Sequence, residues 1–222
     1  MELIPNLHAF IWDSETVNNC NSYLIRAEEK NILIDPGHLA HFDHVRRGLA
    51  DLGLSVEDMD LVVCTHAHAD HMESAGIFAD TSARFALHAE DWGMVGKGSP
   101  VFKSAPNMDP KRYEPDLFLT EGELRVGGVS LTIYHTPGHS PGSITIHWKE
   151  TGALFTGDLI FQEALGRTDL PGGNGELLKE SIRQMAKVDA TWLLSGHGGV
   201  ISGAQAVRAN FEQVERFWFG YI

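Results

Sequence analysis

The sequence predicts an α/β fold in which two β-sheets stack face to face and helices cover their outer faces. Strands come in hairpins, and helices come at intervals between the hairpins. Segments 22–35 and 143–158 also share one plan: a serine, a strand, a polar turn, an apolar strand and an aspartate. Each sheet would bury one face on the other sheet and one face under helices. We expect the 222 residues to form a single domain, residues 1–222.

The first half of the chain alternates between strand and helix patterns. Segment 22–35 predicts a hairpin, because two apolar runs flank a polar turn and a Pro-Gly turn signal follows. Segment 42–52 predicts an amphipathic helix, with Val45 and Leu49 on one face and Gly53 at its end. The other elements expected here are a strand over 8–12, a capped turn over 55–58, a strand over 61–64, a helix over 73–80, a strand over 84–88 and a helical turn over 89–94.

The second half begins with a long segment of little periodicity, residues 95–117. A loop of this length in a compact domain is commonly functional, so we interpret it as a lid over the site, with a plain surface excursion as the alternative. A Gly-Gly turn then indicates a hairpin over 124–134. The remaining elements expected are the hairpin over 143–158, a helix over 176–188, a strand over 191–194 and a helix over 204–219.

The composition indicates which kinds of partner the protein binds and in which cellular compartment we expect it. The formal net charge of −13 argues against nucleic acid and anionic membranes, since both are bound through basic patches. No apolar stretch is long enough for a transmembrane helix, and residues 1–5 do not resemble a signal peptide. Only two cysteines are present, which fits a reducing cytoplasm. We therefore expect a cytoplasmic protein that acts on a small molecule, and a homodimer stays open.

Candidate metal ligands are most concentrated in segment 65–71, Thr-His-Ala-His-Ala-Asp-His, which directly follows the predicted strand 61–64. Loops at strand ends are where α/β proteins place functional residues. Neutral imidazole and carboxylate suit zinc and neighbouring transition metals. Side chains two apart on an extended loop point the same way, so His66 and His68 can share one ion. Asp70 and His71 then point elsewhere, which suggests a second ion.

Three further candidate ligands, His139, Asp158 and His197, each follow a predicted strand. A shared edge of the two sheets would bring them to the histidine cluster. His139 would complete the first ion with His66 and His68. His197 would join Asp70 and His71 on the second ion, and Asp158 has two oxygens with which to bridge both ions. Zinc is the expected metal, with iron or manganese as alternatives.

These motifs resemble the metallo-β-lactamase superfamily. The resemblance rests on the Thr-His-x-His-x-Asp-His cluster, the Thr-Pro-Gly-His that ends at His139, Gly157-Asp158 and Gly196-His197, and it extends from about residue 8 to about residue 205. It implies an αββα four-layer sandwich with a metal site at the sheet edge. Segments 155–158 and 166–173 are similar to the glyoxalase II-like (hydroxyacylglutathione hydrolase-like) enzymes, especially the short bacterial type.

Two departures from glyoxalase II bear on a glutathione substrate. The full-length enzymes carry a C-terminal helical domain that helps to hold glutathione, whereas one helix is expected here after His197. The family's ligand histidine is commonly followed by glutamate and an aromatic residue, whereas Gly198 and Gly199 follow His197 here. The metal ligands themselves are unaffected by both departures.

Three more residues are candidates for supporting or substrate-binding roles. Asp35 matches a family position near the site and is expected to fix a ligand histidine; the alternative is a turn-capping aspartate. His135 lies four residues before His139 and is either a supporting residue or a buried, hydrogen-bonded histidine. Arg167 could meet an anionic substrate, or form an ion pair with Asp169 or another acid.

The predicted activity is hydrolysis of a thioester or an ester. A hydroxide bridging the two ions would attack the carbonyl carbon, and Asp70 could orient that hydroxide or accept its proton. One alternative is a persulfide dioxygenase, an oxidoreductase of the same superfamily that resembles this chain in Gly-Arg-Thr-Asp, with one iron at the positions of His66, His139 and Asp158. A lactonase and a non-enzymatic, metal-stabilised binding domain are two further candidates.

Overall fold

The computed structural model describes residues 1–14, 16–95 and 109–222. The chain divides into two compact units. The first unit comprises residues 1–119 and 126–128, and the second unit comprises residues 120–125 and 129–222. The greater part of the expected lid, residues 96–108 of 95–117, lies outside the described residues.

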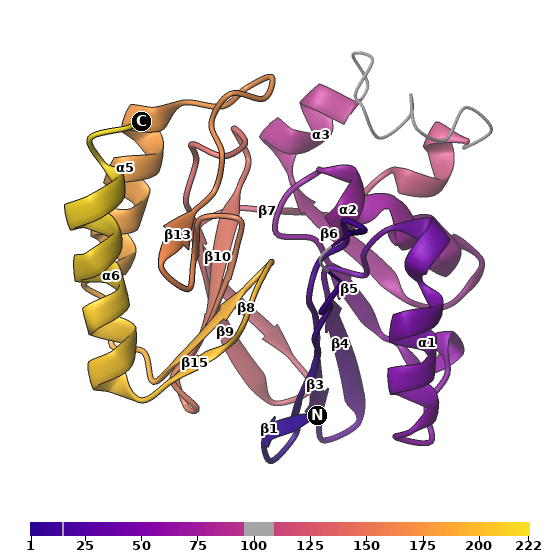
Figure 1. Cartoon of the computed structure of the whole chain (residues 1–222). Coiled ribbons are helices and arrows are strands. Elements are labelled where there is room, and N and C mark those ends of the chain that lie inside the picture. Colours follow the sequence, from indigo (N-terminus) through magenta and orange to yellow (C-terminus); the bar gives the residue numbers. More distant parts are fainter. Residues whose placement is uncertain (15, 96–108) are drawn as a thin grey trace. The chain divides into compact units, whose positions relative to one another are not determined.

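The first unit is built on a seven-stranded sheet in the order β1-β2-β3-β4-β5-β6-β7 (Figure 1). Strands β1 to β4 pair antiparallel, and β4 to β7 pair parallel. The predicted hairpin of residues 22–35 is the β3–β4 pair, in which Leu24 faces Leu33. The strands are β1 (Glu2–Ile4), β2 (Leu7–Phe10), β3 (Ser22–Ala27), β4 (Lys30–Ile34), β5 (Leu61–Val63), β6 (Arg84–His88) and β7 (Leu117–Leu119).

Short helices connect these strands. Those described are η1 (Leu39–His41), α1 (Asp43–Ala50), η2 (Val56–Asp58), α2 (Ala69–Met72), η3 (Glu73–Asp80), α3 (Ala89–Val95) and η4 (Pro110–Tyr113). The helix expected over 73–80 is a 3-10 helix, and one α-helical turn, α2, precedes it. The helix packs tightly at its centre, because a Cβ on Gly76 would lie 2.5 Å from the Tyr113 ring.

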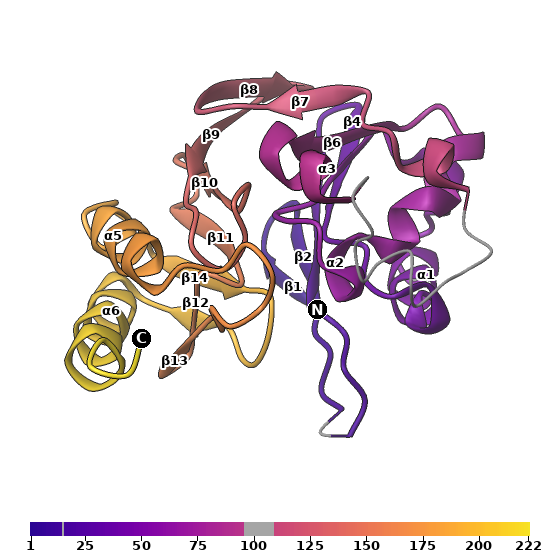
Figure 2. The same ribbon diagram turned by 90° about the horizontal axis from the view of Figure 1, so that it is seen from above.

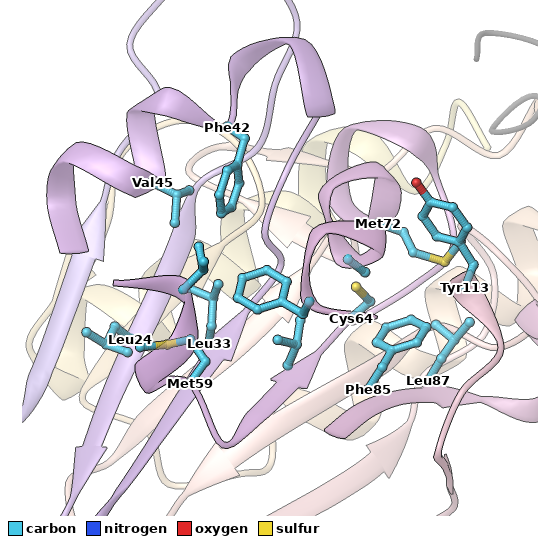
Figure 3. Close-up of a cluster of buried hydrophobic side chains, with 14 of the residues drawn as sticks. Leu24, Leu33, Phe42, Val45, Met59, Cys64, Met72, Phe85, Leu87 and Tyr113 are labelled. Atoms are coloured by element: carbon cyan, nitrogen blue, oxygen red, sulfur yellow. The ribbon is translucent and has the colours of Figure 1, made fainter. Parts of the chain in front are cut away.

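A hydrophobic core fixes the helices of the first unit on one face of the sheet (Figure 3). Helix α1 contributes Val45 and Leu49, which lie one turn apart and are fully buried. The strands contribute Leu24 and Leu33 to the same cluster. The Phe42 and Phe78 rings pack edge to face with centroids 5.8 Å apart. This core supports the loop that follows β5, since Cys64, Ala67 and Met72 belong to the cluster.

The second unit is built on a six-stranded sheet in the order β15-β14-β11-β10-β9-β8. Strands β11 and β14 pair parallel, and the other pairings given for this sheet are antiparallel. A small hairpin, β12–β13, follows β11. The strands are β8 (Gly122–Val126), β9 (Val129–His135), β10 (Ile144–Trp148), β11 (Ala153–Gly157), β12 (Ile160–Phe161), β13 (Ala164–Leu165), β14 (Trp192–Ser195) and β15 (Ile201–Ser202).

Two helices, α5 (Gly175–Met185) and α6 (Ala204–Trp218), lie side by side along one face of this sheet (Figure 2). Leu178 and Ile182 of α5 share a buried cluster with Phe211 of α6 and with Leu154 and Leu193 of the sheet. The four-residue spacing of Leu178 and Ile182 gives α5 its apolar stripe. Among the helices that the structure describes, none is both long and apolar enough to span a bilayer.

The two units repeat one plan. In each unit a hairpin (β3–β4 or β10–β11) is followed by a strand that pairs parallel with the hairpin's second strand (β5 or β14). The repeat noticed between segments 22–35 and 143–158 is therefore structural. The mixed α/β class is confirmed, with two large sheets and helices. The face-to-face stacking of the sheets and the single domain stay predictions.

Candidate functional site

The histidine cluster of the first unit follows β5, as the sequence predicts, but only His66 and His68 lie in the connecting loop, whereas Asp70 and His71 belong to helix α2. His66 and His71 are buried, whereas His68 and Asp70 are half-buried. The ring centroids of His66 and His68 lie 4.8 Å apart, and those of His66 and His71 lie 4.1 Å apart. Asp70 Oδ2 lies 4.0 Å from His71 Nε2. Four side chains that could bind a metal through nitrogen or oxygen therefore gather where the loop after β5 enters α2.

Asp35 holds this loop from the end of β4. Its side chain is almost fully buried and accepts three hydrogen bonds, from Thr65 N (2.7 Å), Thr65 Oγ1 (2.8 Å) and His71 Nδ1 (2.9 Å). Asp35 also has a left-handed backbone, with φ of 52°. Because Asp35 accepts from Nδ1 of His71, the proton of the neutral ring is on Nδ1 and the lone pair is on Nε2. Asp35 thus contacts a predicted ligand histidine, beyond any role in the turn.

Thr65 extends this arrangement to His66. The hydroxyl of Thr65 has one hydrogen, which it donates to Asp35 Oδ2. Its oxygen lies 3.1 Å from His66 Nδ1 and accepts a hydrogen bond from that atom. His66 therefore also has the tautomer in which Nε2 offers a lone pair. A single carboxylate, Asp35, sets the tautomers of two predicted ligands.

Sequence reasoning missed two residues that contact the same loop. Asp91 of α3 is fully buried, and its Oδ2 accepts a hydrogen bond from Ala67 N at 2.7 Å. Asn18 donates from Nδ2 to Asp70 Oδ2 at 2.8 Å. An acidic residue in the first turn of a helix is common, so Asp91 carried no signal that set it apart. Asn18 lies 52 residues from Asp70 along the chain, and only the fold brings the two together.

The second unit brings together its own three predicted ligands. His139 Nε2 and His197 Nε2 lie 3.4 Å and 3.3 Å from the same atom, Asp158 Oδ2. His139 Nδ1 donates to the carbonyl oxygen of Arg167 at 2.7 Å, which leaves the lone pair of the neutral ring on Nε2. His197 follows β14, and its carbonyl oxygen accepts from Ser195 Oγ at 2.8 Å. The three side chains come from the ends of different elements, and all three ligand atoms point to one place.

A close backbone approach holds this half of the site together. A Cβ added to Gly166 would lie 1.8 Å from the Asp158 carbonyl oxygen and 3.2 Å from His139 Nδ1. Only glycine fits between the two ligand residues. The Gly166-Arg167 segment therefore supports both of them, Asp158 through packing and His139 through the Arg167 carbonyl group.

The side chains of Arg167 and His135 have partners of their own. Arg167 forms a two-pronged ion pair with Asp169, at 2.7 Å and 2.6 Å, and both side chains are more than half exposed. The guanidinium lowers the pKa of Asp169 to about 2. His135 Nε2 lies 2.8 Å from the Pro141 carbonyl oxygen. Arg167 is thus paired with Asp169, and His135 is hydrogen-bonded but only half-buried; their roles in the site stay predictions.

The sequence of the chain is similar to a known protein family and to several known proteins. Residues 16–197 match the family described as the metallo-beta-lactamase superfamily. Hydroxyacylglutathione hydrolase GloC of Haemophilus influenzae is 35% identical over 204 residues, covering 86% of this chain and 91% of that protein. The probable metallo-hydrolase YqgX of Bacillus subtilis is 31% identical over 186 residues, covering 80% of this chain and 84% of that protein.

Solved structures of similar proteins cover most of the chain. The metallo-beta-lactamase family protein TTHA1429 from Thermus thermophilus has a TM-score of 0.78 and 24% identity, covering 96% of this chain and 79% of that one. TTHA1623, solved in a di-iron-bound form, has a TM-score of 0.70 and 28% identity over 89% and 92% of the two chains. ETHE1 from Myxococcus xanthus has a TM-score of 0.65 and 25% identity over 95% and 90%.

Proposed function

Because the chain belongs to the metallo-β-lactamase superfamily, we propose that it is a metal-dependent hydrolase of a thioester or an ester. The membership confirms the predicted fold class, an α/β fold of the metallo-β-lactamase type. The superfamily consists typically of hydrolases that bind metal, and the His/Asp clusters of both units provide ligands of that kind. The proposal also specifies the metal ions and the substrate class, which are argued in turn below.

We propose that the chain binds two divalent ions. His66, His68 and His139 would hold the first ion, and Asp70, His71 and His197 the second. Asp158 would bridge the two ions. Zinc remains the expected metal. The di-iron form of the relative TTHA1623 supports iron as an alternative, and manganese accepts the same ligands.

The observation that carries this proposal is the geometry around Asp158 Oδ2. Its distances to His139 Nε2 and His197 Nε2, 3.4 Å and 3.3 Å, exceed those of ordinary hydrogen bonds. Ligands about 2.0–2.1 Å from a tetrahedral zinc ion are separated from one another by about 3.4 Å. The carboxylate oxygen at this separation from both imidazole nitrogens fits a ligand that shares an ion with each of them, as a bridging Asp158 would.

Bound divalent ions would make water nucleophilic at neutral pH and polarise the carbonyl group of the substrate. Among the proposed ligands, Asp70 would orient the attacking water or accept its proton. It is half-buried, and Asn18 holds its Oδ2, which restricts rotation of the carboxylate. The buried His66 and His71, with Nε2 as acceptor, would serve only as ligands.

We propose a thioester as the substrate class. The relative GloC is named as a hydroxyacylglutathione hydrolase and covers 86% of this chain. The Gly166–Gly173 segment, through which the chain resembles the glyoxalase II-like enzymes, contacts His139 and Asp158. An ester or lactone substrate would use the same ligands and stays an alternative.

The Gly-Arg-Thr-Asp segment, residues 166–169, supports a second candidate function, a persulfide dioxygenase. The similarity to ETHE1 from Myxococcus xanthus, over 95% of this chain at 25% identity, is compatible with this alternative. The resemblance to persulfide dioxygenases implies a single iron ion at His66, His139 and Asp158. The two functions differ in metal count and in oxygen consumption.

The test combines elemental analysis of the native protein with two assays, hydrolysis of a hydroxyacylglutathione thioester and oxygen uptake with glutathione persulfide. The hydrolase proposal expects about two metal ions per chain, thioester turnover and no oxygen uptake. Asp158→Ala should abolish turnover, whereas Asp189→Ala, an exposed carboxylate of the same unit, should not. One iron per chain with oxygen uptake would establish the dioxygenase instead.

A further inference from the structure

Asp91 is a fully buried carboxylate that the proposed ligand set does not use. It lies in α3 and accepts a hydrogen bond from Ala67 N at 2.7 Å. Ala67 stands between His66 and His68, the two histidines proposed to share one ion. A bond to this backbone amide restrains the backbone on which both side chains are mounted.

The loop is held in this way at two alternate residues. Asp35 accepts from Thr65 N and Asp91 accepts from Ala67 N, both at 2.7 Å. Burying a carboxylate is costly unless its oxygens are hydrogen-bonded. Two buried carboxylates on one loop have therefore lost their hydration, and in exchange they fix the conformation of the loop backbone. Packing alone does not explain them, because an apolar residue would fill the space of Asp91 without that cost.

We infer that Asp91 is a positioning residue that sets how tightly the His66–His68 pair binds its metal ion, acting through its hydrogen bond to Ala67. This inference rests on the proposed function. With the Asp91–Ala67 bond in place, His66 and His68 are preorganised for a common ion. Without it, the loop has to be ordered when the ion binds, and that ordering lowers the affinity.

The test is zinc binding by chelator competition, with no substrate present. Asp91→Ala removes the acceptor and should weaken the binding of one of the two zinc ions about 10- to 100-fold. Asp91→Asn keeps a carbonyl oxygen for Ala67 N and should bind zinc to within a few-fold of the wild type. If Asp91→Ala binds zinc like the wild type, or Asp91→Asn is as defective as Asp91→Ala, the inference is wrong.

Asp116 provides a matched control. Its carboxylate also accepts a backbone hydrogen bond, from Phe85 N at 2.9 Å, and forms an ion pair with Arg84. Asp116→Ala should lower the melting temperature and leave zinc affinity unchanged. His66→Ala separates the role of Asp91 from the ligand set on which it rests. Unchanged zinc binding in His66→Ala would refute the proposed ligand set, whereas a loss in His66→Ala but not in Asp91→Ala would refute only the role of Asp91.

Discussion

At the scale of single residues, three of the predicted ligands are held in the same way. His66, His71 and His139 each use Nδ1 for a hydrogen bond, to Thr65 Oγ1, Asp35 and the Arg167 carbonyl oxygen respectively. In the neutral ring this leaves Nε2 as the electron-pair donor. Three histidines with the same tautomer are what a metal site needs, and a surface cluster of histidines would have no reason to share it.

Changing Asp35 to asparagine should disturb two of these tautomers at once. An amide has only one acceptor oxygen, so its NH₂ group must face Thr65 Oγ1 and His71 Nδ1 or lose the bond to Thr65 N. We expect metal affinity about 10- to 100-fold lower, measured by chelator competition. Asp60→Asn, which affects a carboxylate bound to Asn31 N in the same unit, is the control. Wild-type affinity in Asp35→Asn would contradict the arrangement described.

The bridging role of Asp158 gives a sharper prediction. Asp158→Ala removes the one oxygen that lies near both His139 and His197. At least one metal position should empty, and turnover should fall to background. Elemental analysis and the thioester assay are run on the same preparation. An active variant with full metal content would refute the bridge.

The Arg167–Asp169 ion pair predicts in which direction its contribution to stability changes with pH. Arg167 lowers the pKa of Asp169 from 3.8 to about 2, so its stabilising effect is present above pH 3.8 and is lost as the pH falls towards 2. Arg167→Gln should return the pKa of Asp169 towards 3.8, as measured by NMR titration. Stability at neutral pH should hardly change, because both side chains are exposed. A pKa that stays near 2 in the variant would show that another group is responsible.

At the scale of elements, the segment after β11 is the most constrained. Gly166→Ala would place a methyl group 1.8 Å from the Asp158 carbonyl oxygen, so the segment must move and carry the Arg167 carbonyl group away from His139. We expect lower thermal stability together with lost metal. Gly93→Ala is the matched control, since a Cβ there meets nothing within 4 Å and alanine favours helix α3. Equal metal content in both variants would contradict this expectation.

The elements with the clearest patterns could be predicted from the sequence. The hairpins β3–β4 and β10–β11 have apolar strands around a polar turn, and α1, α5 and α6 have an apolar stripe. The strands β1, β12, β13 and β15 have two or three residues each, too few for any periodicity to show. Strand β7 begins at Leu117, inside the segment expected to be a loop.

The ligands could be proposed because their residue types are diagnostic and each follows a strand. Asp91 and Asn18 could not, because neither has an unusual neighbour in sequence. Their partners, Ala67 and Asp70, are 24 and 52 residues away along the chain. The sequence therefore indicates the candidate ligands and, through the family resemblance, Asp35, whereas the contacts of Asp91 and Asn18 depend on the tertiary fold.

At the scale of the whole molecule, the proposed ions link the stability of the chain to metal supply. The chain carries a formal charge of −13, part of which bound cations would offset. A ligand that binds only the folded state at 100 times its Kd stabilises by about 2.7 kcal/mol. For a chain of this size that is an upward shift of roughly 5–11 °C in Tm.

Removal of the metal should therefore lower Tm by several degrees, and added zinc should restore it in a concentration-dependent manner. Scanning calorimetry of chelator-treated protein with and without zinc measures both. His66→Ala, with a predicted ligand removed, should show a smaller response. The same Tm with and without metal, at full loading, would contradict the proposed coupling.

The residue at position 35 has to satisfy two independent requirements, one on its backbone and one on its side chain. The left-handed backbone at φ of 52° is open to glycine, asparagine and aspartate, whereas the three hydrogen bonds of the side chain require a carboxylate. Glycine or asparagine at this position would therefore suit the backbone but leave buried donors of Thr65 or His71 without an acceptor. Proteins of this kind that carry glycine or asparagine here are expected to bind metal more weakly, even when every ligand residue is present.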